Sequence, residues 1–113
     1  MGRNDNRLQV LEQLIAELEK RRKASPAKSY TAKLLDQGRH KIGKKLGEEG
    51  VEMALALVDG KKKEFIGEAA DVMYHYLVAL MARKVPFAAV MDELERRFGL
   101  SGLEEKARRN KKS

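Results

Sequence analysis

The sequence predicts an all-α fold, a small bundle of about five helices. No segment alternates apolar and polar residues over any length, as a half-buried strand would. Apolar residues instead recur at intervals of three and four. The residue types that dominate the chain also favour helix over sheet: Ala, Leu, Glu, Lys and Arg.

The first helix is expected over about 5–23. Asp5 is a suitable N-cap, and one apolar stripe follows it at helical spacing: Leu8, Leu11, Leu14, Ile15 and Leu18. Pro26 disfavours helix at the residue before it, so the pattern breaks there. A short helix is then expected to start at residue 29 or 30 and to end before Gly38.

The middle of the chain is predicted to form two long helices, over about 40–58 and 62–83, with a stop at Asp59-Gly60. A connection this short makes them antiparallel neighbours, and roughly 20 residues give each a length of about 30 Å. The first carries apolar residues on two faces, with Val51, Leu55 and Val58 on one and Ile42, Met53 and Leu57 on the other. A monomer this small cannot bury both faces, so we expect a homodimer to complete the bundle.

The C-terminal part continues the helical pattern. Pro86 stands where the first residue of a helix often does, and apolar spacing predicts a helix over 87–98, closed by Gly99. The motif Ser-Gly-Leu-Glu over 101–104 matches a capping box, which favours a last short helix. The stretch 108–113 is basic and is expected to be a flexible tail.

Bulk properties restrict the class of protein. At 113 residues the chain has room for one domain, expected over 1–113. It has no cysteine, which excludes disulfides and thiolate metal sites and fits a reducing compartment. Its first residues lack the apolar region of a signal peptide, and no apolar run approaches the roughly 18 residues that span a bilayer. A cytoplasmic protein without a membrane segment is expected.

The charge of the chain indicates an anionic partner. Its formal net charge is +7, and basic runs occur at 21–23, 61–63 and 108–112. Such a protein attracts phosphorylated metabolites, nucleic acids and anionic membrane surfaces. The sequence has no recognisable helix-turn-helix and no aromatic platform for stacking bases, so a nucleic-acid partner is not favoured.

Acidic side chains on the first long helix lie beside its apolar stripe. At about 100° per residue, one flank carries three acids and two lysines: Glu48, Glu49, Glu52, Lys41 and Lys45. Acids that only face solvent would usually sit opposite the stripe. The flank is therefore a candidate site.

The second long helix repeats the arrangement, with Glu68, Asp71 and His75 on one face. An antiparallel hairpin would bring five carboxylates together, and they would repel one another unless a cation neutralised them. Oxygen ligands without cysteine favour a hard cation, Mg²⁺ or Mn²⁺, and such a cation suggests phosphate chemistry. Geometry alone leaves one alternative open, a surface ion-pair network of these acids with Arg39, Lys41, Lys44 and Lys45.

The acids and the segments around them resemble a known family. Their spacing, Glu-Glu-x-x-Glu and then Glu-x-x-Asp, is similar to the signature of the all-α nucleoside-triphosphate pyrophosphohydrolase (MazG-like) superfamily. Within it, three stretches resemble the phosphoribosyl-ATP pyrophosphatases of histidine biosynthesis: 29–34, 41–49 and 68–77. The segments Ser-Tyr-Thr-Ala and Glu-Ala-Ala-Asp…Tyr-His are the most specific, because the wider superfamily shares only the acids. The resemblance covers residues from about 8 to 97.

The resemblance implies an enzyme that hydrolyses 1-(5-phosphoribosyl)-ATP to 1-(5-phosphoribosyl)-AMP and pyrophosphate, the second step of histidine biosynthesis. Mg²⁺ would be held against the triphosphate by the five acids: Glu48, Glu49, Glu52, Glu68 and Asp71. One of the first pair, Glu48 or Glu49, would also orient or deprotonate the attacking water.

The resemblance also implies residues that bind the substrate. Lys41 and Lys45 would contact phosphate oxygens. The mouth of the site would be formed by the start of the short helix: Ser29, Tyr30 and Thr31. His75 is expected either to lie at the edge of the core, hydrogen-bonded to Asp71, or to orient Asp71 toward the metal. Gly50 departs from the alanine more common in relatives, and it suggests a close contact between helices.

Two other functions compete with this one. The same acids would serve a house-cleaning hydrolase of aberrant or excess nucleoside triphosphates, although the segment 29–33 favours the histidine-pathway substrate. A small basic helical protein that binds nucleic acid through its lysine runs belongs to a different class, and strongly salt-dependent binding would identify it.

Overall fold

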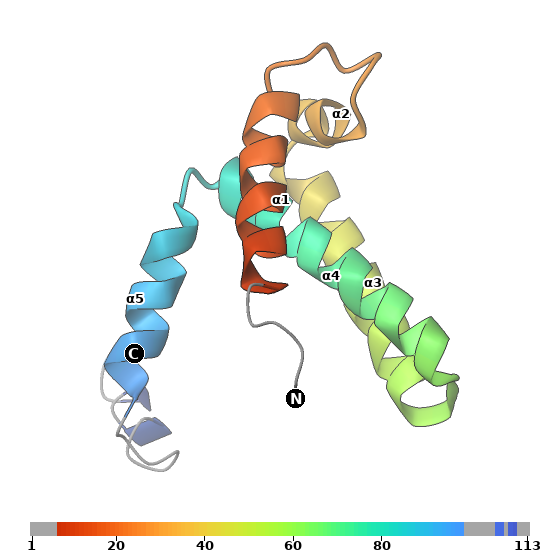
Figure 1. Ribbon diagram of the computed structural model, residues 1–113, viewed down its shortest axis with the longest axis vertical. Coiled ribbons are helices and arrows are strands. Elements are labelled where there is room, and N and C mark those ends of the chain that lie inside the picture. Colours follow the sequence, from red (N-terminus) through yellow and green to blue (C-terminus); the bar gives the residue numbers. More distant parts are fainter. Residues whose placement is uncertain (1–6, 99–105, 108, 111–113) are drawn as a thin grey trace.

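The computed structural model describes residues 7–98, 106–107 and 109–110 of the chain (Figure 1). Its helices are α1 (Leu8–Arg21), α2 (Tyr30–Gln37), α3 (Arg39–Asp59), α4 (Lys62–Ala82) and α5 (Phe87–Arg97). The described residues contain no strand, and the prediction of an all-α fold with about five helices is confirmed. None of the described helices is both long enough and apolar enough to cross a membrane.

The helix boundaries agree with the predictions to within one residue at α2, α3 and α4. α1 stops at Arg21, two residues before the expected end, and begins at Leu8 within the described residues. The predicted cap Asp5, the predicted stop Gly99 and the capping box over 101–104 lie outside the described residues. Of the predicted tail, only 109–110 are described, and they are helical, as are 106–107.

Pro86 was predicted to be the first helical residue of α5, but it lies one residue before the helix. Its backbone is extended, with φ −72° and ψ 148°, and it caps the helix that begins at Phe87. The difference is one residue. A fixed φ near −65° suits both positions, so ψ, which proline leaves free, decides between them.

A single glycine joins α2 to α3 and lets the chain turn sharply. Gly38 has φ +94° and ψ 174°, a combination that is essentially confined to glycine. Its N–H donates to Leu34 O at the end of α2, and its carbonyl accepts from Ile42 N at the start of α3. The two helices therefore follow one another without a loop, and α2 stays beside the start of α3.

The end of α4 is closed by a left-handed residue that is not glycine. Lys84 has φ 60°, its N–H donates to Met81 O, and Val85 N–H donates to Leu80 O. These two bonds form a Schellman motif, which satisfies carbonyls that the end of a helix leaves unpaired. The chain then leaves the bundle through Val85 and Pro86.

The long helices α3 and α4 form an antiparallel hairpin, and the core lies at its open end, where α1 and α2 are added (Figure 1). Leu34 from α2, Ile42 from α3 and Val78 from α4 are buried together. Leu18, only 1% exposed, anchors α1. The buried residues therefore gather at one end of the hairpin and leave its turn without cover.

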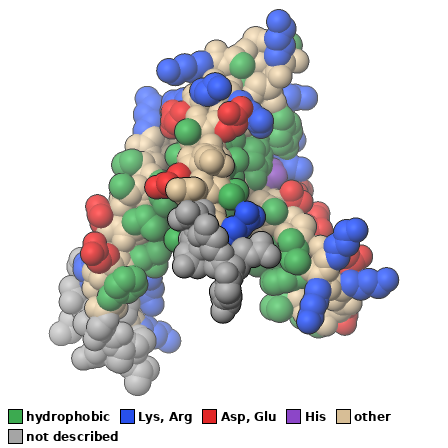
Figure 2. Space-filling view, in the orientation of Figure 1, with side chains coloured by type: hydrophobic (Ala, Val, Ile, Leu, Met, Phe, Trp, Pro, Cys, Tyr) green, Lys and Arg blue, Asp and Glu red, His purple; other side chains and the backbone are tan. Residues whose placement is uncertain are grey.

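Large apolar side chains are exposed over the rest of the molecule (Figure 2). On α3 they form the stripe of Val51, Leu55 and Val58, each at least 60% exposed. α5 lies apart from the hairpin and buries no residue, although it carries Met91 and Leu94 and is followed by Phe98. The stripe on α3 is one of the two faces from which a homodimer was predicted, and the homodimer stays a prediction.

Candidate metal and substrate site

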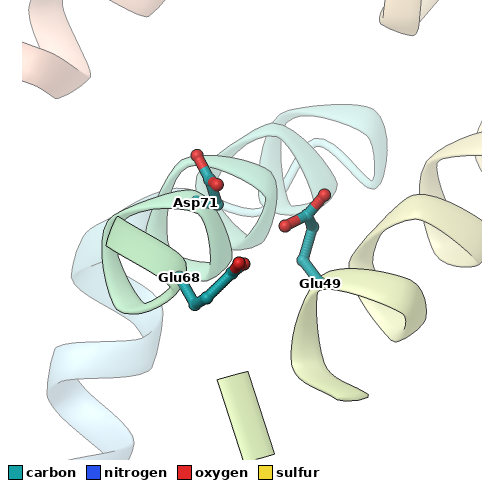
Figure 3. A group of neighbouring side chains, drawn as sticks. All are labelled: Glu49, Glu68 and Asp71. Carbon is teal, nitrogen blue, oxygen red and sulfur yellow. The ribbon is translucent and has the colours of Figure 1, made fainter. Parts of the chain in front are cut away.

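Three carboxylates meet between the middle of α3 and the first half of α4 (Figure 3). Glu49 reaches across from α3, whereas Glu68 and Asp71 project from successive turns of α4. Each offers one oxygen, and these oxygens all lie within 4.8 Å of one another. The antiparallel hairpin causes this meeting, because residues spaced i and i+3 on α4 share the face that α3 covers.

Two of the three acids carry an oxygen that is buried without a partner. Glu49 Oε1 and Glu68 Oε1 have no hydrogen bond and almost no contact with solvent. Buried polar atoms are nearly always satisfied, so each such atom calls for an explanation. Burial, followed by the charges of Glu52, Glu49 and Asp71, raises the pKa of Glu68 above its ordinary value of 4.5.

Glu52 adjoins this group, whereas Glu48 does not. The Glu52 carboxylate is close enough to Glu68 for its charge to contribute to the raised pKa. Glu48 is exposed and lies outside the group of three. Four of the five predicted acids are thus close enough for their charges to interact. The fifth, Glu48, is next to Glu49 in the sequence but does not join the group.

In the described part of the chain, no basic residue forms an ion pair with the acids of the group. Among the described residues, none of the recorded ion pairs joins one of the five acids to a lysine or arginine. Lys41 is exposed and Lys45 is half-buried on the same helix. The ion-pair network that competed with a metal site is therefore not formed here, whereas a hard cation would satisfy both orphan oxygens.

A second group of candidate site residues lines a pocket with Asp71, around the start of α2. Ser29 caps this helix, with its Oγ accepting from Ala32 N at 3.1 Å. Thr31 is buried, and its Oγ1 is 2.7 Å from the hydroxyl of Tyr74 on α4. The predicted substrate-mouth segment is thus fixed to α4 by this contact, and Tyr30 is its exposed member, at 52%.

His75 is buried one turn after Asp71, and it bonds to the backbone rather than to the carboxylate. Its Nδ1 donates to the Asp71 carbonyl oxygen at 2.8 Å. The first interpretation of this residue, a histidine at the core edge hydrogen-bonded to Asp71, therefore agrees with the structure. Its Nε2 is buried and has no partner, which neither interpretation anticipated.

Sequence reasoning missed three residues of this region. Tyr74 bonds to Thr31, and burial raises its pKa. Arg21 and Lys28 line the same pocket as His75 and Asp71. Lys28 carries no local signal, and the basic run over 21–23 does not indicate that Arg21 lies near α4, because only the tertiary fold brings these segments into one pocket.

The predicted close helix contact at Gly50 is wrong within this chain. A Cβ added at Gly50 would meet no atom within 4 Å. The glycine is therefore not required by packing against α4, and nothing else in the structure explains it.

Fold and site together define a class, namely an all-α protein that gathers carboxylates from two consecutive helices in a form suited to a hard cation. Comparison with known proteins makes this specific. Residues 11–98 match the family model of the phosphoribosyl-ATP pyrophosphohydrolases. The chain belongs to this family.

Relatives named phosphoribosyl-ATP pyrophosphatase support the assignment. The protein of Novosphingobium aromaticivorans is 48% identical over 90% of this chain and 95% of its own length. That of Cereibacter sphaeroides is 52% identical over 90% of this chain and 99% of its own length. That of Methylobacterium nodulans is 54% identical over 78% and 82% respectively.

Proposed function

We propose that the protein hydrolyses 1-(5-phosphoribosyl)-ATP to 1-(5-phosphoribosyl)-AMP and pyrophosphate, in histidine biosynthesis, with Mg²⁺ as its cofactor. The observation that carries the proposal is the group of Glu49, Glu68 and Asp71, whose oxygens lie within 4.8 Å of one another. Membership of the phosphoribosyl-ATP pyrophosphohydrolase family indicates which substrate is hydrolysed.

The residues present fit a hard divalent cation. Glu49, Glu68 and Asp71 would hold Mg²⁺, with Glu52 next to them, and two of their oxygens are buried without another partner. Mn²⁺ is compatible with the same oxygen donors. When bound, the metal neutralises charge on the triphosphate and lowers the pKa of a coordinated water.

The remaining side chains would bind and orient the substrate. Glu49 is placed better than Glu48 to orient or deprotonate the attacking water, because it faces α4 whereas Glu48 is exposed. Lys41 and Lys45 lie on the helix that carries Glu49 and would contact phosphate oxygens. Cleavage between the α and β phosphates then releases pyrophosphate, and the phosphoribosyl-AMP part stays next to the start of α2.

The test is pyrophosphate release from phosphoribosyl-ATP with and without Mg²⁺. Asp71→Asn and Glu52→Gln should reduce Mg²⁺-dependent turnover at least about a hundredfold, on the scale seen when groups that act only in the transition state are removed. Glu12→Gln, an exposed acid on α1, is the matched control and should keep full activity.

Three results would contradict the proposal. Full activity of Asp71→Asn would refute the assignment of the metal site. Faster turnover of free nucleoside triphosphates than of phosphoribosyl-ATP would favour the house-cleaning function. Salt-dependent DNA binding that survives Glu49→Ala would favour the nucleic-acid function. Complementation of a histidine auxotroph that lacks this step tests the assignment in the cell.

We further propose that the protein works as a homodimer of one domain in the cytoplasm. Its accessible surface of 8944 Å² exceeds the roughly 6,300 Å² expected for a compact monomer of this mass. The uncovered stripe of Val51, Leu55 and Val58 would be buried by the second copy.

A further inference from the structure

A pocket of about 610 Å³ lies next to the acid group and shares Asp71 with it. Its walls come from the end of α1, the loop that follows, the first turn of α2 and the middle of α4. The acid group would hold the triphosphate end of a nucleotide. The pocket is therefore placed to receive another part of the same molecule.

The outer wall of this pocket is cationic. Arg21 and Lys28 line it, and Lys28 forms no ion pair with any described residue. Arg21 donates to Glu17 through Nε at 3.1 Å. The two terminal nitrogens of its guanidinium therefore remain available to donate to a ligand. The N-terminus of α2 adds N–H groups that have no partner within the helix, because Ser29 Oγ accepts only from Ala32 N. This combination suits a phosphate.

The inner wall presents a hydrogen-bond acceptor. His75 is 6% exposed and lines the pocket. Its Nδ1 donates to a backbone carbonyl oxygen, so in the neutral ring Nε2 carries a lone pair and accepts. That atom is buried and unpartnered, and the natural complement for such an acceptor is a hydroxyl group.

We propose that this pocket binds the 5-phosphoribosyl group of the substrate, with a ribose hydroxyl donating to His75 Nε2 and the phosphate bound by Lys28 and Arg21. The proposal rests on the proposed function and extends it from the triphosphate to the other end of the substrate. A sugar phosphate offers a hydroxyl donor and a dianion together, which matches the two walls of the pocket.

Tyr30 lies beside the inner wall and would control access to it. Its ring is 52% exposed, and its centroid lies 6.4 Å from that of His75 in an edge-on arrangement. A rotation of this exposed ring away from Tyr74, on which it stacks at a centroid distance of 6.2 Å, would give the sugar access to Nε2. Tyr74 is held by its 2.7 Å contact with Thr31 and stays as the fixed wall.

This subsite would make the enzyme selective. Phosphoribosyl-ATP and ATP share the triphosphate and differ by the phosphorylated sugar, so only groups outside the acid cluster can distinguish them. A lost charge-assisted hydrogen bond at Lys28 would weaken binding of phosphoribosyl-ATP and leave that of ATP unchanged.

The test measures binding of ribose 5-phosphate to the metal-free protein by calorimetry, and of Mg²⁺-ATP to the metal-loaded protein. Lys28→Ala should weaken ribose 5-phosphate at least about tenfold and change Mg²⁺-ATP by less than about twofold. Lys23→Ala, an exposed lysine of the same loop that does not line the pocket, is the matched control and should change neither.

His75→Asn removes the proposed acceptor, Nε2, but can keep the hydrogen bond that Nδ1 makes to the Asp71 carbonyl oxygen. The Asn side-chain amide can still donate to the Asp71 carbonyl, but it lacks an atom at the position of Nε2. It should weaken ribose 5-phosphate and leave binding of inorganic phosphate unchanged, because inorganic phosphate has no sugar hydroxyl. It should also raise KM for phosphoribosyl-ATP more than it lowers kcat.

Equal affinity of wild type and Lys28→Ala for ribose 5-phosphate would overturn the subsite, as would an equal loss for ribose 5-phosphate and Mg²⁺-ATP. The outcome is separable from that of the proposed function. A wild-type protein that turns over phosphoribosyl-ATP, with a Lys28→Ala variant that does so equally well, refutes the subsite alone. A wild type that binds ribose 5-phosphate through Lys28 without releasing pyrophosphate refutes the proposed function alone.

Discussion

Among the residues of the acid group, Glu68 is the one whose charge the fold opposes most clearly. It is partly buried, it adjoins Glu52, and it lies in the group with Glu49 and Asp71, all of which raise its pKa above 4.5. An acid with a raised folded pKa stabilises the fold below its unfolded pKa, and this contribution is lost as the pH rises through the folded pKa.

Glu68→Gln should therefore make the metal-free protein more stable than the wild type at about pH 7. The advantage should shrink as the pH falls toward about 4.5, because the wild-type carboxyl then binds a proton and the repulsion disappears. Thermal unfolding followed by circular dichroism in EDTA measures the difference, with Glu12→Gln as the control. A variant less stable than wild type at neutral pH would mean that Glu68 is a structural partner.

Residue identity predicted the acids but not all of their surroundings. The spacing of Glu49, Glu68 and Asp71 was enough to predict that they lie together, because an antiparallel hairpin of two helices determines which positions face each other. The contact between Thr31 and Tyr74 joins α2 to α4, and no periodicity encodes it. Thr31 was expected at the substrate mouth, but its side chain is 1% exposed and supports the pocket wall.

At the level of the elements, the position of α2 depends on one backbone conformation. Gly38 ends α2 and precedes α3 with φ +94°, and nothing lies within 4 Å of where its Cβ would be. The requirement for glycine is therefore conformational rather than steric crowding by neighbours. The pocket depends on this junction, because Ser29, Tyr30 and Thr31 belong to the helix that Gly38 orients.

Gly38→Ala should destabilise the protein by about 1–3 kcal/mol, the usual cost of a non-glycine residue held in this region. Gly43→Ala is the control, since Gly43 is helical and its Cβ also meets open space, and it should stabilise by about 0.5–1 kcal/mol. Urea unfolding measures both. If Gly38→Ala were neutral, the junction would have to relax to another conformation without cost.

Element boundaries were predictable where a local residue sets them. Gly38 and Asp59-Gly60 ended their helices as expected. Lys84 was not predictable as the left-handed residue after α4, because lysine carries no turn signal and the Schellman bonds at Met81 and Leu80 create the position. How α5 lies relative to the hairpin also has no local signal in the sequence.

At the scale of the whole molecule, the described chain leaves much apolar surface uncovered. Its radius of gyration of 16.5 Å exceeds the roughly 13 Å of a compact domain of this length. The buried residues lie at one end, and the turn end of the hairpin carries the apolar stripe of α3. A second copy of the chain would bury surface that nothing in the described part of the chain covers.

Sedimentation should give twice the chain mass of 12.8 kDa. Leu55→Glu places a charge in the middle of the stripe and should shift the protein toward monomer, because an unpaired charge is costly in an apolar interface. Leu55 is 64% exposed in the single chain, so helicity should be unchanged. Val10→Glu, at an exposed apolar position of α1, should leave the mass unchanged, and a wild-type monomer would contradict the dimer.

The hairpin that carries the acids also has a consequence for the order of folding. α3 and α4 are consecutive and separated only by Gly60 and Lys61, so Glu49, Glu68 and Asp71 meet through contacts between near neighbours in the sequence. Contacts of this kind form fast, on the order of microseconds to milliseconds in helical proteins. The acid group should therefore assemble early, before a second chain docks. A divalent cation present during refolding should then accelerate the folding step itself, in addition to stabilising the finished protein.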